Sequence, residues 1–239
     1  KQETKTYYEF EKSEPGEYFQ NEFEQNNRLK SVLSAETKGK LIHSILEKDL
    51  SVEAIEPFLQ KFFKAQRLDY LPEQIEDFKS IIINELTNYY SSEAYRTLRL
   101  AENQQNEFQV YLKEKDFYLF GIVDKVIFTE ETLTIVDYKT DNVPVEELPA
   151  RAKDYFLQLT FYAFILIRLF PDKKEILLRI IFIKFPDENF SLKVEDNELV
   201  QLEAFVVDMT EKIRKKDFSK SLHHCRQCHF ADSRNNCIF

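Results

Sequence analysis

The sequence predicts an α/β fold in which a helical first part precedes a mixed β-sheet flanked by helices. Apolar residues recur at helical spacing through most of residues 36–90. Strand-like runs joined by short polar turns then occupy residues 106–140. A long apolar helix over 154–170 separates these runs from two further strands. Strands interrupted by a helix of this length are typical of a sheet covered by helices.

Three helices are expected in the first part, over residues 36–50, 52–65 and 71–90. The first carries an apolar stripe made of Leu41, Ile42, Ile45 and Leu46. The third begins with Pro72 in its first turn, where a proline is well tolerated, and then repeats apolar residues at helical spacing.

The sheet is expected to begin with three strands, because the turns "KEKD" and "TEET" divide residues 106–140 into three runs. After the helix over 154–170, strands follow at 175–185 and 189–195, and a helix covers 197–216. The predicted organisation is one integrated domain. It comprises a helical N-terminal part (1–104), a core (105–216) and a Cys/His-rich tail (217–239). Residues 1–35 carry no motif.

Composition narrows the class of protein. The 239 residues are 43% hydrophobic, enough for a full core, and carry a formal net charge of −9, which argues against strong autonomous binding to nucleic acid. Only three glycines occur, so a glycine-rich phosphate loop is excluded. No apolar run reaches the roughly 18 residues of a membrane span, and no signal peptide pattern opens the chain, so a cytoplasmic location is expected. The first residue is Lys1, which suggests a piece of a longer protein.

The stretch "LTIVDYKT" places two opposite charges in an otherwise apolar strand. Asp137 and Lys139 are two residues apart and therefore leave the same face, while Val136 and Tyr138 face the other way. One interpretation is a solvated ion pair on an edge strand. The other is half of a metal site.

A second aspartate favours the metal site. Asp124, in "GIVDKVIF", stands thirteen residues before Asp137, a distance that suits antiparallel neighbours joined by the "TEET" turn. Two carboxylates at one depth of a sheet repel each other unless a cation neutralises them, and oxygen ligands suit Mg²⁺ or Mn²⁺. Lys139 could then hold an attacking water or stabilise charge on a phosphate.

The motifs "GIVD", "DYKT" and "QLTFY", in this order, resemble the RecB/AddA-type branch of the PD-(D/E)XK nucleases, the C-terminal nucleases of helicase–nucleases that process broken DNA ends. The resemblance implies a restriction-endonuclease-like core. It implies Asp124 and Asp137 as catalytic metal ligands, helped by the main-chain carbonyl of Tyr138, and Lys139 as the catalytic lysine. Gln158 and Tyr162 share a helix face, where the resemblance places them against DNA.

Two upstream residues extend this resemblance, which spans residues 36–165. "GKLIHSILE" is similar to the family's leading helix motif, in which a histidine four residues after a glycine completes the metal shell; here it is His43. Glu107 in "NEFQVYL" matches a family glutamate more weakly, as a supporting residue or secondary ligand. A lone histidine on an apolar helix is otherwise most often a core residue.

The implied function is a Mg²⁺-dependent (or Mn²⁺-dependent) deoxyribonuclease. We expect the exonuclease domain of a DNA-end-processing helicase–nuclease in recombination and repair, with DNA and a helicase domain of the same chain or complex as partners. A bound metal would polarise the scissile phosphate and lower the pKa of a water that Lys139 orients. The alternatives are a stand-alone CRISPR-associated-type nuclease of the same fold, a non-cleaving DNA-binding module, and a scaffolding domain with structural Asp–Lys pairs.

The tail "HHCRQCHFADSRNNC" contains Cys225, Cys228 and Cys237, together with three histidines. Related nucleases hold an iron–sulfur cluster with four cysteines, but this sequence has no cysteine before Cys225. Zinc held by three thiolates and a histidine is the remaining metal option. Because one ligand is missing and the spacing differs, we expect no tail metal. The missing cysteine also counts against the CRISPR-associated alternative.

Overall fold

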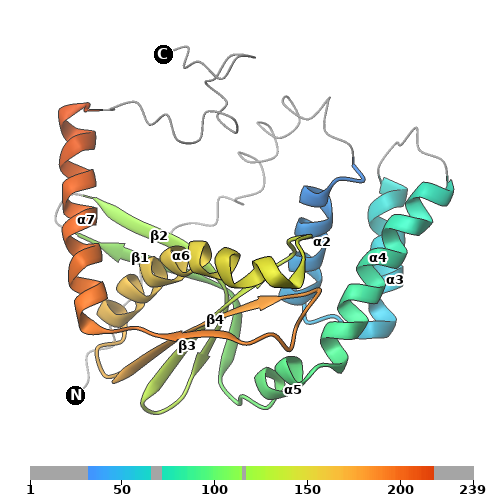
Figure 1. Ribbon diagram of the computed structural model, residues 1–239, viewed down its shortest axis with the longest axis horizontal. Coiled ribbons are helices and arrows are strands. Elements are labelled where there is room, and N and C mark those ends of the chain that lie inside the picture. The colour runs from blue at the N-terminus through green and yellow to red at the C-terminus, as the bar shows by residue number, and fades with distance from the viewer. Residues whose placement is uncertain (1–31, 66–71, 115–116, 218–239) are drawn as a thin grey trace, which may run out of the picture.

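The computed structural model describes residues 32–65, 72–114 and 117–217 (Figure 1). Its helices are α2 (Ala35–Glu47), α3 (Val52–Ala65), α4 (Pro72–Ser91), α5 (Glu93–Arg99), a short 3₁₀ turn (Val145–Glu147), α6 (Leu148–Leu169) and α7 (Asp196–Lys215). Its strands are β1 (Gln104–Lys113), β2 (Tyr118–Phe128), β3 (Thr132–Lys139), β4 (Glu175–Phe182) and β5 (Phe190–Lys193).

The predicted α/β class is confirmed: a helical part precedes a mixed sheet flanked by helices. The order of the strands is β1-β2-β3-β4-β5, and every neighbouring pair is antiparallel except β3 and β4, which are parallel. The parallel pair follows from α6, because a long helix between two strands carries the chain back to the starting edge. Helix α5 and the 3₁₀ turn are not predicted from the sequence, since a single seven-residue helix contains too few residues to show a period.

Two hydrophobic cores lie on opposite faces of the sheet. On one face, α2, α3 and α4 pack against Val136 and Tyr138 of β3. On the other face, α6 covers Leu133 and Ile135 of the same strand (Figure 1). The alternation of the strand therefore sends Asp137 and Lys139 toward α6, as the sequence predicts.

The sheet forks beside these residues. The described ladder between β2 and β3 runs from Phe128 opposite Leu133 to Lys125 opposite Val136 and goes no further. Strand β2 continues toward its start at Tyr118 paired with β1 alone. The β1–β2 hairpin thus separates from β3 at Asp124, and polar side chains can meet in the opening.

Helix α2 is tied down next to this fork. The Lys38 amine is almost fully buried and lies 2.8 Å from both carboxylate oxygens of Glu85 on α4. A buried lysine needs such a partner, since an unpaired charge in the interior is costly. Just after the end of β3, Gly39 lets α2 approach closely, because a Cβ there would stand 3.0 Å from Thr140 Oγ1. These contacts set the position of His43, one turn further along α2.

The described helices include none that combines the length and the apolar character needed to cross a lipid bilayer.

Candidate metal-dependent active site

Asp137 and Lys139 form a close ion pair at the end of β3. Lys139 Nζ lies 2.6 Å from Asp137 Oδ2, and both side chains are largely buried, with 16% and 6% exposed. This oxygen accepts no hydrogen bond of good geometry, so the ion pair is its sole polar contact among the described residues. A solvated edge-strand pair is excluded, because β3 lies between β2 and β4 and the carboxylate is buried.

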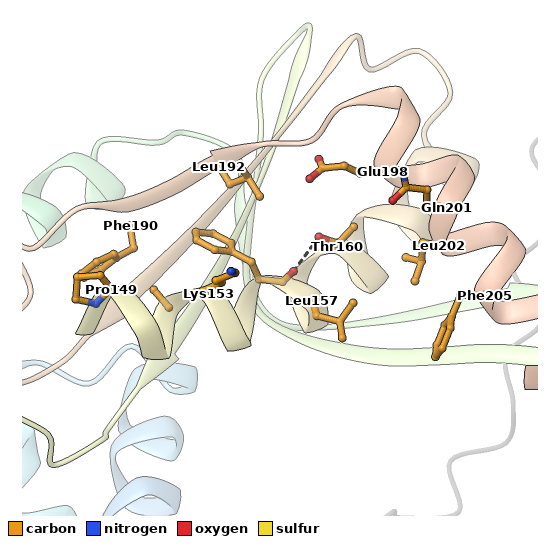
Figure 2. Close-up of a pocket in the computed structure, with 12 residues that line it drawn as sticks. Pro149, Lys153, Leu157, Thr160, Phe190, Leu192, Glu198, Gln201, Leu202 and Phe205 are labelled. Atoms are coloured by element: carbon orange, nitrogen blue, oxygen red, sulfur yellow. Dashed lines mark hydrogen bonds between the residues drawn. The ribbon is translucent and has the colours of Figure 1, made fainter. Parts of the chain in front are cut away.

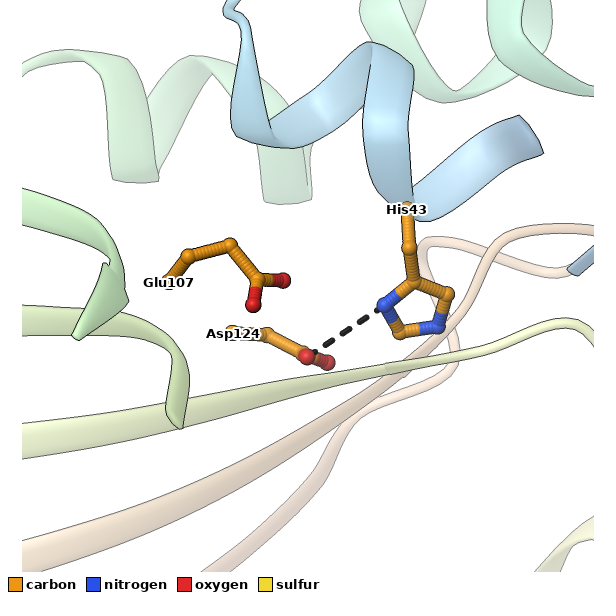
Figure 3. A group of neighbouring side chains, drawn as sticks. All are labelled: His43, Glu107 and Asp124. Carbon is orange, nitrogen blue, oxygen red and sulfur yellow. Dashed lines mark ion pairs between the residues drawn. The ribbon is translucent and has the colours of Figure 1, made fainter. Parts of the chain in front are cut away.

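Asp124 stands on β2 at the fork, where it connects three elements. One carboxylate oxygen, Oδ2, accepts a hydrogen bond of 2.7 Å from the backbone N–H of Tyr138. The other, Oδ1, lies 3.3 Å from Nδ1 of His43 on α2 (Figure 3). The β2–β3 register, continued by one residue, sets Asp124 opposite Asp137. The predicted antiparallel arrangement of the two aspartates is therefore present.

Glu107 approaches the same point from β1. In the β1–β2 register it stands between the pairs Asn106–Lys125 and Phe108–Val123, directly opposite Asp124. Its backbone is left-handed, with a φ of 46°. A glutamate pays a conformational cost there, and such strain is concentrated at functional sites. One ligand atom each from His43, Glu107 and Asp124 lies within 4.8 Å of the others (Figure 3).

The charges at the fork disturb one another. Burial raises the pKa of Glu107 to about 7, and the nearby Asp124 adds to the effect. Burial and Asp124 likewise raise the pKa of Asp137 to about 6, although Lys139 opposes the rise. Burial works against a charged His43, yet the surrounding carboxylates outweigh it and raise the pKa of the imidazole. The fork thus has an excess of negative charge that a cation would relieve.

Replacing Glu107 with glutamine is expected to stabilise the metal-free protein at pH 8. Raising a carboxyl pKa from 4.5 to about 7 on folding corresponds to roughly 3 kcal/mol. Solvent screens part of this at a half-buried group, so we expect a gain of about 1 kcal/mol, or roughly 2–4 °C in the unfolding midpoint. The folded pKa is the higher one, so the penalty acts in full above about pH 7. It disappears as the pH falls to about 4.5, where both states bind the proton.

Thermal unfolding in EDTA at pH 8 and pH 4.5 measures this difference. Glu102→Gln, at an exposed carboxylate two residues before β1, is the matched control and should leave the midpoint unchanged at both pH values. A midpoint for Glu107→Gln at pH 8 at or below that of the unsubstituted chain would contradict the repulsion inferred at the fork.

Helix α6 supplies the third side of the fork. Gln158 Oε1 accepts a bond of 3.4 Å from Lys139 Nζ, and Gln158 Nε2 donates to Tyr162 Oη at 2.8 Å. The Tyr162 ring rests on Gly121 of β2, where a Cβ would come within 2.7 Å of the ring. Glycine is therefore needed at 121 for the ring to lie where it does. The two residues lie on one helix face, as their spacing predicts, and Gln158 links the pair to Lys139.

Tyr155 belongs to this group and is absent from the sequence-based set. Lys139 Nζ lies 4.2 Å from the centre of its ring, a cation–π contact. The Tyr155 hydroxyl donates to Asp141 Oδ1 at 2.7 Å, and Arg151 lies 3.6 Å from the same oxygen. A signal for it exists in the sequence. Tyr155, Gln158 and Tyr162 are spaced by three and four residues, which places all three on one side of α6.

The donor set suits a hard divalent cation. Two carboxylates and an imidazole converge from three elements, and Mg²⁺ and Mn²⁺ prefer such oxygen-rich sites. The sequence names Asp124, Asp137 and His43 as ligands and Glu107 as support. The structure groups Glu107 with His43 and Asp124, while the Asp137 carboxylate is paired with Lys139. The cysteines and histidines of the tail lie outside the described residues.

Comparison with known protein families identifies the family to which this chain belongs. The model of the PD-(D/E)XK nuclease superfamily matches residues 16–233. This chain belongs to the PD-(D/E)XK nuclease superfamily. Its predicted nuclease fold is thereby confirmed, and the relatives described next are nucleases by name.

Two relatives of this PD-(D/E)XK chain are informative. The CRISPR-associated exonuclease Cas4 of Francisella tularensis subsp. novicida (strain U112) is 26% identical over 138 residues, which is 56% of this chain and 65% of that protein. The chain thus matches just under two thirds of that relative's length. The crystal structure of an exonuclease candidate from Eubacterium rectale aligns with a TM-score of 0.50 at 14% identity, covering 88% of this chain and 78% of that one. At this identity it supports the fold alone.

A large groove elsewhere in this nuclease-fold chain is not the active site. It encloses about 670 Å³ between α6, β5 and α7 (Figure 2). Its walls are mostly apolar, with Phe156, Leu157 and Phe205 among them, and none of the fork residues lines it. Lys153 and Glu198 are the only charged residues in its lining, so the groove has no cluster of carboxylates that could hold a catalytic cation.

Proposed function

We propose that this chain is a divalent-metal-dependent deoxyribonuclease that hydrolyses phosphodiester bonds at the β1–β2–β3 fork. The observation that carries the proposal is the convergence of His43, Glu107 and Asp124 beside the Asp137–Lys139 pair. A member of a nuclease superfamily that had become a structural module would have no need to keep repelling carboxylates, a strained glutamate and a buried lysine together.

Each side chain has a proposed role. His43, Asp124 and Asp137 would hold Mg²⁺ or Mn²⁺ with the main-chain carbonyl of Tyr138, and Glu107 would complete or support the site. When bound, such a cation supplies charge to a scissile phosphate and lowers the pKa of a coordinated water. The Lys139 amine would orient the attacking water and stabilise the developing negative charge.

Residues of α6 would keep the lysine in place and receive the substrate. The Lys139 amine already has two neighbours on this helix besides Asp137, namely the Gln158 oxygen and the Tyr155 ring. These contacts hold a flexible side chain in one position, which lowers the entropy lost when the substrate binds. Gln158 and Tyr162 would then contact the DNA backbone at the mouth of the fork.

The biological setting is a finer proposal with two versions. The motifs resemble the nuclease domains of helicase–nucleases, with a helicase partner and a role in recombination and repair. The CRISPR-associated exonuclease relative favours the second version, a stand-alone nuclease of that type. We favour this version, because the match to the curated exonuclease is the more specific observation. A helicase partner has no comparable support, and the proposal of exonuclease rather than endonuclease activity rests on the relative's name alone.

Labelled DNA provides the direct test. Single-stranded and duplex oligonucleotides, labelled at either end, should be shortened in the presence of Mg²⁺ or Mn²⁺ and left intact in EDTA. Products that shorten stepwise from one end support an exonuclease. Intact DNA at every concentration of Mg²⁺ and Mn²⁺ would refute the proposed activity and favour the non-cleaving binding module.

A further inference from the structure

The β1–β2 hairpin presents a row of exposed side chains that leads to the fork. Val110 and Val123 of the hairpin point into the core beneath α6, so their neighbours in each strand point away from it. This outward row, which we call the hairpin face, consists of Gln109, Tyr111, Lys113, Tyr118, Phe120 and Ile122.

The hairpin face is aromatic and unusually exposed. Tyr118 is 63% exposed, Tyr111 53% and Phe120 47%. Tyr111 and Phe120 face each other across the ladder, with ring centres 4.5 Å apart and planes inclined by 31°. Such a nearly stacked pair offers one broad π surface to an incoming planar group. Large aromatic side chains that are exposed to solvent do not contribute the free energy of burial to folding. A patch of them on a strand therefore indicates a surface that binds a partner.

The hairpin face continues directly into the proposed active site. Its last pair, Gln109 and Ile122, is followed two residues further along each strand by Glu107 and Asp124. Asp124 contacts His43 of α2, which packs on the side of the sheet opposite α6. The row of exposed rings therefore leads along both strands to the candidate metal group. From Tyr118 to Asp124 the strand covers roughly 20 Å.

Charge on the hairpin differs from charge on the rest of the chain. The chain carries a formal net charge of −9, yet residues 108–113 and 118–123 contain no acidic residue. The one charge among them is Lys113, whose amine lies 5.9 Å from the centre of the Tyr118 ring. Between the hairpin turn, where Glu114 stands, and the fork, the two strands therefore present no carboxylate to a polyanion before Glu107 and Asp124.

We propose that the hairpin face is a stacking surface for the unpaired bases of a single nucleic-acid strand whose backbone enters the fork. This inference rests on the proposed nuclease function and specifies its substrate as single-stranded. Unpaired bases expose flat faces that stack on aromatic side chains in any sequence, whereas the stacked pairs of a duplex do not. In an acidic chain with few phosphate contacts, stacking would supply much of the affinity.

Fluorescence anisotropy with labelled dT20 in EDTA tests the proposal without any cleavage. Phe120→Ala should weaken binding about tenfold, in the range measured for loss of one stacked base. Phe120→Leu keeps most of the apolar area but removes the ring, and should weaken binding by a similar factor. Phe120→Trp should retain the affinity. Phe205→Ala, which removes a 56%-exposed phenylalanine from α7, is the matched control and should bind like the unsubstituted chain.

Three results would overturn the proposal. They are an absence of dT20 binding by the unsubstituted chain, an unchanged affinity in Phe120→Leu, and an equal loss in Phe205→Ala. The unfolding midpoint of each variant, measured in the same buffer, shows whether a weaker affinity reflects the loss of a DNA contact or the loss of the fold. Turnover of bis(p-nitrophenyl) phosphate by the unsubstituted chain with Mn²⁺ tests the proposed chemistry separately. This substrate is too small to reach from the fork to Phe120, so its hydrolysis without dT20 binding would refute the stacking surface alone.

Discussion

Lys139→Ala is expected to reduce DNA cleavage by about a thousandfold or more while the chain still folds and binds metal. Positioned proton-transfer groups typically contribute 10²–10⁴-fold, and the Lys139 amine would also stabilise transition-state charge. The amine is held at three points, by Asp137 at 2.6 Å, by Gln158 at 3.4 Å and by the Tyr155 ring at 4.2 Å. Such restraint is typical of a group whose position matters as well as its charge.

The same substitution should leave Mn²⁺ binding intact or make it tighter. Removing the amine frees the Asp137 carboxylate from its ion pair and returns uncompensated negative charge to the fork. Cleavage of a labelled oligonucleotide at saturating Mn²⁺ and titration calorimetry with Mn²⁺ alone measure the two effects independently. Lys184→Ala is the matched control, because this lysine follows β4, next to the end of β3, and bonds Asn142 instead of a fork residue. Full cleavage by Lys139→Ala would show that the lysine has no catalytic role.

Much of this fork is predictable because strands impose a strict alternation. Asp137 and Lys139 lie on one face for the same reason that Val136 and Tyr138 lie on the other. The thirteen-residue spacing of the aspartates predicts that β2 pairs with β3 in antiparallel orientation, as it does. The face on which a side chain of a strand or helix lies can be predicted from the sequence alone, because the side-chain direction repeats regularly along these elements. The same holds for Gln158 and Tyr162, whose spacing puts them on one side of α6.

The remaining features depend on tertiary contacts that no local pattern records. Glu107 has a left-handed backbone, which a glutamate in a strand-like sequence gives no reason to expect. Its grouping with His43 and Asp124 arises because the hairpin leaves β3 at this point, and strand divergence has no signature in residue spacing. Tyr155 was missed because a tyrosine on an apolar helix is usually a core residue, and its contact with Lys139 depends on how α6 crosses the sheet.

The second large effect concerns Asp124, whose replacement by asparagine should nearly abolish metal binding and cleavage together. Asparagine has the same shape, and its side-chain oxygen can still accept from the Tyr138 N–H, so the fold should survive. What disappears is the negative charge at the point where β1, β2, β3 and α2 meet. Changes to outer partners of metal sites already cost 10–100-fold in affinity, so loss of a direct ligand should weaken Mn²⁺ binding by more than about 100-fold.

His43→Ala should give a smaller loss than Asp124→Asn, because the imidazole brings a neutral donor and no negative charge to the cation. Alanine favours a helix, so α2 should persist, with Lys38 and Glu85 still paired. Calorimetric titration of Mn²⁺ into metal-free protein ranks the two variants, with Asp208→Asn on the exposed face of α7 as the matched carboxylate control.

If His43→Ala bound Mn²⁺ as tightly as the unsubstituted chain, the histidine would be a neighbour of the site and not a ligand. If Asp124→Asn did so, the metal would have to be held without the carboxylate that touches both α2 and β3, and the centre of the site would move to Asp137, which is paired with Lys139.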